Sequence, residues 1–371
     1  MRARESRRRV LTALASSLAL LASLAAPAAS QTALTASIGR AFQSFPAADQ
    51  SGQATDASFE VERTFANRVR LFYDGDVGTF SAPGDWGYAL HVAGIVVQKG
   101  DTTANATRLT AGASGSWRSN GASWDAAGYV GLRGFLDVEW RPSATTTVHT
   151  GYQFDRRAFD ELPDLDQREH TVVASLLSNL QVTRTTLFGQ AAAGAKAYAG
   201  DSGSGAHLAR QLTLIGRVAQ NLTARTGVSL QYSRRLISGR VPPVLVLTPP
   251  LFFDDGVYDD LYASAAQSWR AGVTRVLGAA GSLDAALSEA RKNYRDFPAL
   301  DLDGMPIAGG GIRADTIRRA GLTWTLPISR DHTGPLGVDV NVGYGYTRHR
   351  SNDLVYNYSS HSLGIGLTVA H

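Results

Sequence analysis

Apolar and polar residues alternate along this chain with a period of two. Within residues 335–349 one face would carry Leu336, Val338, Val340, Val342, Tyr344 and Tyr346. The other face is small or polar, from Gly337 to His349. A helix cannot hold a period of two over such a length, whereas a strand produces it directly. Similar alternation recurs within 130–140, 148–155, 228–235 and 319–326, so the sequence predicts an all-β protein.

The alternating stretches are long. Strands of soluble proteins usually have ~5–6 residues, whereas a tilted strand needs ~9–11 residues to cross a membrane. Aromatic residues stand toward the ends of the apolar faces: Trp140, Tyr232, Trp324, Tyr344 and Tyr346. In lipid every backbone polar group must be hydrogen-bonded within the protein, and strands achieve this only by closing into a barrel. The sequence therefore predicts a transmembrane, antiparallel, up-and-down β-barrel.

We expect about sixteen strands, at 33–45, 56–63, 67–79, 86–97, 106–117, 124–140, 146–156, 168–180, 185–198, 207–219, 225–236, 259–276, 283–295, 314–327, 336–349 and 354–371. Fourteen is the alternative, because residues 46–56 are polar and the second stretch is short. Short connections alternate with long ones such as 156–169 and 238–259. Barrels of this class carry their long loops outside, so both termini are expected at the periplasmic rim.

Residues 1–30 are predicted to be a cleaved signal peptide, and residues 31–371 the barrel domain. Five arginines precede an apolar run that begins at Val10, and small residues at 28–30 fit a cleavage site. A membrane anchor helix and a twin-arginine signal (Arg7-Arg8) are the alternatives. The chain has no Cys, which excludes disulfides, thiolate metal sites and a cysteine nucleophile.

Charge gives no sign of a nucleic-acid partner. The whole chain has 36 Lys+Arg and 32 Asp+Glu, for a net charge of +4. Five of those arginines and one of the acids lie in residues 1–30, so the remaining chain is neutral. Beyond residue 30 there is no apolar run of ~18 residues, so no transmembrane helix is predicted. The 38 Gly, with 13 Tyr, 13 Phe and 6 Trp, suit curved strands with aromatic girdles.

The C-terminal stretch HSLGIGLTVAH alternates Leu363, Ile365, Leu367 and Val369 with small or polar residues. With this C-terminal pattern, the chain resembles porin-like Gram-negative outer-membrane β-barrel proteins. The resemblance extends from the signal peptide to the last residue. The resemblance implies that the last strand is read by the barrel-assembly machinery. The family usually ends in Phe at that signal, whereas this chain has His371. We expect the last strand to pair with the first.

The inward faces should hold charges of both signs. The predicted pore-lining residues are Arg70, Arg133, Asp137, Glu139, Arg217, Arg235, Arg319 and Asp339, and Glu60, Glu62 and Arg210 are placed with them. One interpretation is a lumen filled by salt bridges and water. The other is an aqueous pore with a transverse field, because a barrel of about sixteen strands is wide enough for a channel.

The loop RVPPVLVLTPPLFFDDG (240–256) is the second candidate site. Its apolar side chains include Leu245, Leu247, Phe252 and Phe253, and they either fold into the barrel mouth or form a lid that binds a ligand or partner. Acidic loop clusters at 160–169, 254–260 and 301–303 are expected to be solvated. The alternative is that they bind divalent cations that bridge lipopolysaccharide.

No motif indicates an enzyme. Asp155 with His149, or Asp339 with His349, are the pairs that would meet across strands in a barrel hydrolase. No nucleophile or zinc-protease motif accompanies them. We therefore predict no catalytic residue, metal or cofactor. The expected function is passive passage of small polar solutes across the outer membrane. The alternative is a structural, assembly or surface-interaction barrel with a plugged lumen, in contact with membrane lipid and lipopolysaccharide.

Overall fold

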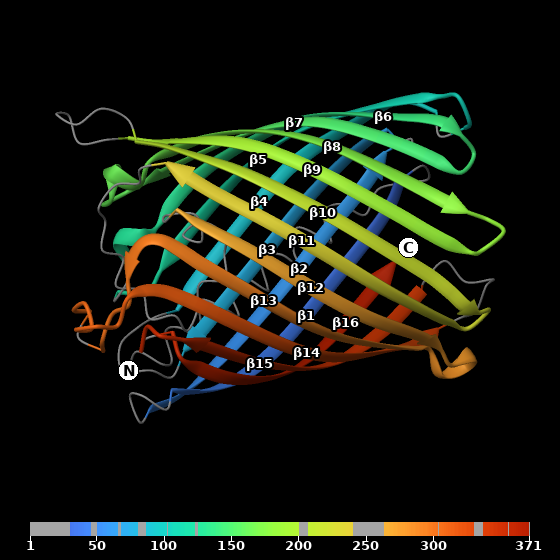
Figure 1. Ribbon diagram of the computed structural model, residues 1–371. Coiled ribbons are helices and arrows are strands. Elements are labelled where there is room, and N and C mark those ends of the chain that lie inside the picture. Colours follow the sequence, from blue (N-terminus) through green and yellow to red (C-terminus); the bar gives the residue numbers. More distant parts are fainter. Residues whose placement is uncertain are drawn as a thin grey trace.

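The computed structural model is a closed barrel of sixteen antiparallel strands, each paired with its neighbours in chain order (Figure 1). The structure describes residues 30–45, 50–65, 68–80, 87–101, 103–122, 125–199, 207–239, 263–302, 304–329, 337–354 and 356–370. The strands are β1 (Ser30–Phe45), β2 (Gln50–Phe65), β3 (Val69–Phe80), β4 (Tyr88–Gly100), β5 (Thr107–Asn120), β6 (Tyr129–Ser143), β7 (Thr146–Phe159), β8 (Gln167–Leu180), β9 (Thr185–Tyr198), β10 (His207–Thr223), β11 (Thr226–Gly239), β12 (Ser264–Val276), β13 (Ser282–Pro298), β14 (Ile312–Ser329), β15 (Gly337–Ser351) and β16 (Tyr358–Ala370).

The prediction of sixteen up-and-down strands is confirmed, and the fourteen-strand alternative is wrong. Several boundaries differ from those expected, and two of the larger differences have a local cause. The second strand is longer than 56–63, because β2 pairs with β1 along its whole length, from Gln50 to Phe65. The sixth begins at Tyr129 rather than at 124, because Asp125–Ala127 forms a 3₁₀ turn. No helix in the described part of the chain is long and apolar enough to span a membrane.

The barrel closes between its first and last strands. β1 and β16 pair antiparallel from Ala33 with Ala370 to Ser44 with Ser359, as expected for the final alternating stretch. This closure leaves no free edge, so the backbone groups of every strand are paired on both sides. The predicted signal peptide, up to residue 29, and His371 lie outside the described residues.

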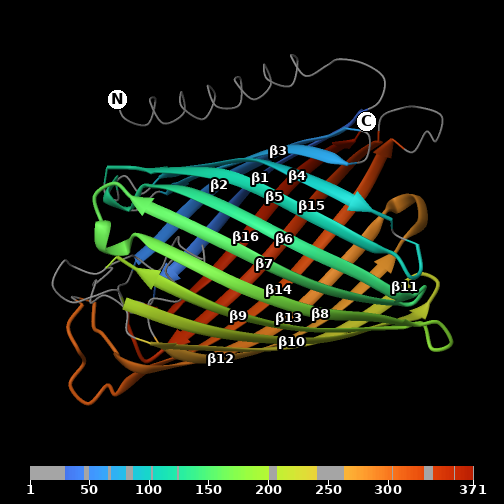
Figure 2. The ribbon, with the colours of Figure 1, turned by 90° about the horizontal axis from the view of Figure 1, so that it is seen from above.

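Short and long connections separate to opposite ends of the barrel, as Figures 1 and 2 show. β6 joins β7 through residues 144–145, and β10 joins β11 through 224–225, at what we call the short-turn end. At the other end, the long-loop end, the β7–β8 connection includes the 3₁₀ turn Pro163–Leu165 and the β13–β14 connection spans 299–311. This is the predicted arrangement of turns and loops.

Each strand has one apolar face, and these faces form the outside of the barrel. Large apolar side chains stand exposed at alternate positions, for example Leu132 and Leu136 on β6 and Ile365 on β16. The side chains at the intervening positions point into the lumen. At the long-loop end it contains a small buried cluster: Tyr129, Phe159, Leu165, Tyr198 and Ala209. The cluster packs the β7–β8 connection against the inner wall and narrows that side of the mouth.

Candidate functional site

The eight predicted pore-lining residues all lie on the inner face of the barrel. Arg133, for example, alternates on β6 with Leu132, which is 54% exposed on the outer face. Side chains of a strand point alternately inward and outward, and this alternation places a further set of residues inside: Arg70, Asp137, Glu139, Arg217, Arg235, Arg319 and Asp339, with Glu60 and Glu62. The placement of Arg210 was wrong. It shares a face with the exposed Leu208 and Leu212 and therefore points outward.

Several inner charges on β5, β6 and β7 are paired with each other. Arg133 Nε donates to Asp155 Oδ1 at 2.8 Å. Glu139 lies between two guanidinium groups, with Arg108 Nη2 at 2.5 Å and Arg141 Nε at 2.8 Å. This part of the wall is a salt-bridge network, as one of the two sequence interpretations expects.

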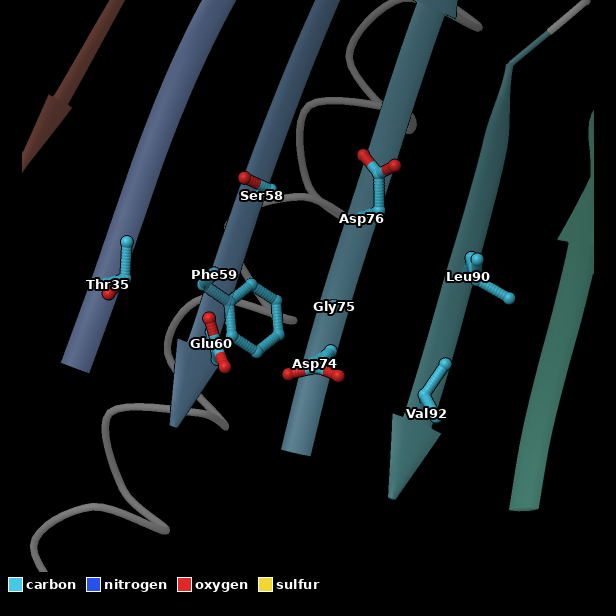
Figure 3. A pocket seen from close by; sticks show the side chains of 9 residues that line it. All are labelled: Thr35, Ser58, Phe59, Glu60, Asp74, Gly75, Asp76, Leu90 and Val92. Carbon is cyan, nitrogen blue, oxygen red and sulfur yellow. The ribbon is translucent and has the colours of Figure 1, made fainter. Parts of the chain in front are cut away.

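The inner wall formed by β2 and β3 is acidic. It carries Asp56, Glu60, Glu62, Asp74 and Asp76, which we call the acidic wall. Figure 3 shows Glu60, Asp74 and Asp76 on these neighbouring strands, around a shallow recess that Thr35 and Leu90 also line. Arg70 Nη1 donates to Glu62 at 2.5 Å, and Tyr88 donates to Asp76 at 3.1 Å. Five carboxylates therefore face one guanidinium on these two strands.

The inner wall formed by β10, β11, β12 and β14 is basic. It carries Arg217, Arg235, Arg270 and Arg319, which we call the basic wall. Arg235 Nη2 donates to Gln211 Oε1 at 3.2 Å. Within the part of the chain that the structure describes, Arg217 and Arg270 form no ion pair and no side-chain hydrogen bond, and both are exposed to the lumen. Their guanidinium groups are therefore free to meet a solute.

The acidic wall faces the β10–β12 part of the basic wall across the lumen, whereas Arg319 on β14 lies four strands from β2. In the closed sheet of sixteen strands, β10 and β11 lie eight strands from β2 and β3, which is half of the circumference. Asp74 and Glu60 lie near the middle of their strands, and so do Arg217 and Arg270. Opposed walls of fixed charge create an electric field across the passage that acts on any ion or dipole between them.

A buried charged cluster that sequence reasoning missed lies on β14 and β15 near the long-loop end. Arg313 Nη2 donates to Asp315 Oδ2 at 2.7 Å, and both side chains are at most 4% exposed. His349 Nε2 lies 3.4 Å from the same carboxylate oxygen, and Arg313 stacks over the Tyr356 ring. Parity on the predicted strand 314–327 was the available signal, because it puts Asp315 on the face of Arg319. Arg313 itself was expected in a loop.

The two carboxylate–histidine pairs considered for catalysis are not formed. His149 Nε2 lies 3.5 Å from Asp137 rather than beside Asp155, which pairs with Arg133. His349 contacts Asp315 rather than Asp339, because the pairing of β14 with β15 brings Asp315 beside His349. Among the described residues no group of His, Asp and Glu has the arrangement of a metal site.

The predicted loop site cannot be placed on the barrel. Leu245, Leu247, Phe252 and Phe253 lie outside the described residues, and so does the acidic cluster at 254–260. In the β7–β8 connection Asp166 accepts a hydrogen bond from the Phe159 backbone at 2.7 Å, which ties that acidic loop to the wall.

Comparison with solved structures finds proteins of the same fold. No family model matches the chain, and no curated protein matches it. The chain is similar to OccK2 (OpdF) of Pseudomonas aeruginosa, solved in complex with glucuronate, with a TM-score of 0.52 and 13% identity over 92% of this chain and 96% of that one. OccAB1 of Acinetobacter baumannii gives a TM-score of 0.53 and 10% identity, with the same coverage. These neighbours are outer-membrane porins, and this chain shares their barrel fold.

Proposed function

We propose that this protein is an outer-membrane channel for passive passage of small polar solutes. Its apolar outer face fits lipid, and the closed strands satisfy the backbone within the bilayer. The long-loop end would face the exterior and the short-turn end the periplasm. The porin fold of its structural neighbours supports this placement.

The observation that carries the proposal is the pair of opposed charged walls. Arg217, Arg270 and Arg319 are exposed to the lumen rather than packed against one another, which favours a water-filled cross-section over a plugged one. Polar solutes that carry a charge or a dipole would be oriented between these arginines and the carboxylates of Glu60 and Asp74. No chemistry on the solute is needed for this role, so we assign no catalytic residue.

Single-channel conductance tests the proposal. The chain would be expressed with its own leader in a Gram-negative host, extracted from outer membranes in detergent and added to a planar bilayer. We expect stable current steps whose size increases with salt concentration. A barrel that migrates as folded on unheated gels, yet gives no steps, would overturn the channel and favour the structural barrel with a plugged lumen.

Assembly is part of the same proposal. The last strand, β16, would be read by the barrel-assembly machinery, because it carries the alternating apolar positions Leu363, Ile365 and Leu367 on its outer face. Replacing His371 with Phe should leave outer-membrane yield equal or higher. A lower yield would argue that a terminal aromatic is not what the machinery reads here.

A further inference from the structure

Four arginines lie close together on the outer wall of the barrel, on three neighbouring strands. They are Arg291 on β13, Arg318 on β14, and Arg348 and Arg350 on β15, which we call the arginine patch. Each shares its face with exposed apolar residues. Leu287, which is 65% exposed, lies on the face of Arg291. Leu322 and Tyr344 mark the same outer face on β14 and β15.

Strand register brings these four side chains together. Arg318 and Arg348 are direct partners across β14 and β15. Thr316 pairs with Arg291 on one side and with Arg350 on the other. Directly paired side chains lie ~4.5–5.5 Å apart at Cβ, and like charges in such positions repel. The patch therefore concentrates positive charge on one small area of the outer surface.

One carboxylate balances the patch only in part. Glu289 is the acidic side chain that contacts the patch, whereas the exposed Arg295 and Asp296 lie beyond it, where β13 bulges near the long-loop end. Glu289 accepts from Arg318 Nε at 2.8 Å and from Arg291 Nε at 2.9 Å. Arg348 and Arg350 make no ion pair or side-chain hydrogen bond in the described structure. Four guanidinium groups against one carboxylate leave capacity for an anion.

The height of the patch indicates which anion it meets. From the patch toward the short-turn end, the outer face carries Tyr346 and then Tyr344 on β15, with Leu322 and Trp324 on β14. Outward aromatic side chains mark the interface between hydrocarbon and headgroups. The arginines lie on the long-loop side of these tyrosines, at the level of lipid headgroups, where an outward charge is tolerated.

We propose that the arginine patch binds the phosphate groups of lipopolysaccharide, the phosphorylated glycolipid of the outer leaflet. A guanidinium presents a planar fork that bonds two phosphate oxygens at once. Clusters of basic residues at headgroup level select anionic lipids in the same way. The inference rests on the proposed outer-membrane placement, with the long-loop end outside. It assigns the lipid contact to the wall of β13–β15 rather than to cation bridges at the acidic loops.

Native mass spectrometry of the delipidated barrel would test the proposal, with bisphosphorylated lipid A as the probe. The test variant is Arg318→Gln/Arg348→Gln/Arg350→Gln, which keeps the Arg291–Glu289 pair. The matched control is Arg184→Gln/Arg225→Gln/Arg275→Gln, which removes three arginines at the short-turn end. We expect the test variant to bind lipid A at least about tenfold more weakly than the wild type, because charge-assisted hydrogen bonds are lost. The control should bind as the wild type does.

Two further probes separate the lipid from a free anion. Dephosphorylated lipid A should bind the wild type as weakly as the test variant binds lipid A. Inorganic phosphate should not compete at millimolar concentration, and full competition would overturn the lipid assignment in favour of a simple anion site. Equal lipid A binding by wild type and test variant would overturn the patch. If the triple variant fails to fold, Arg348→Lys/Arg350→Lys keeps the charge but not the fork, and partial weakening is expected.

Conductance of the same preparations distinguishes this inference from the proposed function. Loss of lipid A binding with normal current steps would support the patch and the channel together. Specific lipid A binding without current steps would overturn the proposed channel and still support the arginine patch as a lipid A site.

Discussion

The acidic and basic walls of the lumen are built on the same strand geometry but differ in how their charges are held. On the acidic wall Glu62 bonds Arg70 and Asp76 accepts from Tyr88, so these two carboxylates are held by neighbouring side chains. On the basic wall Arg217 and Arg270 extend into the lumen with no ion pair to any described residue. At these four residues the two carboxylates are bound to neighbouring side chains and the two guanidinium groups are not, whereas Arg235 of the basic wall does donate to Gln211.

This difference matters for permeation because short carboxylates stay close to the wall, whereas arginine reaches several ångströms into the passage. A solute near the centre of the lumen therefore lies closer to the guanidinium groups than to the carboxylates. We expect the basic wall to influence ion selectivity more strongly than the acidic wall does.

Neutralising the basic wall should give the largest effect. In Arg217→Gln/Arg235→Gln/Arg270→Gln/Arg319→Gln, the remaining carboxylates of β2 and β3 would favour cations. We expect the reversal potential in a tenfold salt gradient to move toward cation selectivity by on the order of 20 mV, within the ~59 mV set by perfect selectivity. An unchanged reversal potential, in a variant that still conducts, would contradict the opposed-wall arrangement.

Neutralising the acidic wall should give a smaller shift of opposite sign. Glu60→Gln/Asp74→Asn/Asp76→Asn leaves the four arginines of the basic wall, so the pore should move toward anion selectivity. The shift is expected to be about half as large, because Asp74 and Asp76 are partly buried and lie against the wall. The same bilayer measurement checks it. A shift equal to or larger than that of the basic-wall variant would show that carboxylates dominate the field.

Sequence predicted the barrel well because its signal is repeated. A period of two over about sixteen stretches specifies strands, faces and closure, so an error at one boundary, such as that of β2, leaves the topology unchanged. The same alternation also puts the eight residues predicted to line the pore on the inner face of the barrel, which is where the structure has them. Arg210 was placed wrongly because it lies seven residues from Arg217 and therefore on the opposite face of the same strand, with Leu208 and Leu212.

Pairing partners could not be predicted in the same way, because they depend on register between strands rather than on the period within one. His149 lies beside Asp137, whereas sequence proximity favoured Asp155. The opposition of acidic and basic walls requires the closed strand order, which no single stretch contains. The buried Arg313–Asp315 pair lies within one strand, β14, and was missed because Arg313 was expected in a loop. The inward orientation of the acidic residues on β3 could be predicted, because they lie on the same face of the strand as Arg70. Their position opposite the arginines of β10 and β11 could not.

The smallest effect is expected where positive and negative charges are already paired within one wall. Arg133 and Asp155 form a 2.8 Å ion pair on β6 and β7, away from both charged walls. Arg133→Gln/Asp155→Asn removes one charge of each sign at the same place, so the reversal potential should stay within about 2 mV of the wild type, far below the ~59 mV limit. Arg133→Gln alone would leave Asp155 uncompensated and shift selectivity slightly toward cations, less so in 1 M salt, where the Debye length is ~3 Å. If the double variant changed selectivity as much as the basic-wall variant, the constriction would lie on β6 and β7, and the contrast between the two walls would lose its meaning for permeation.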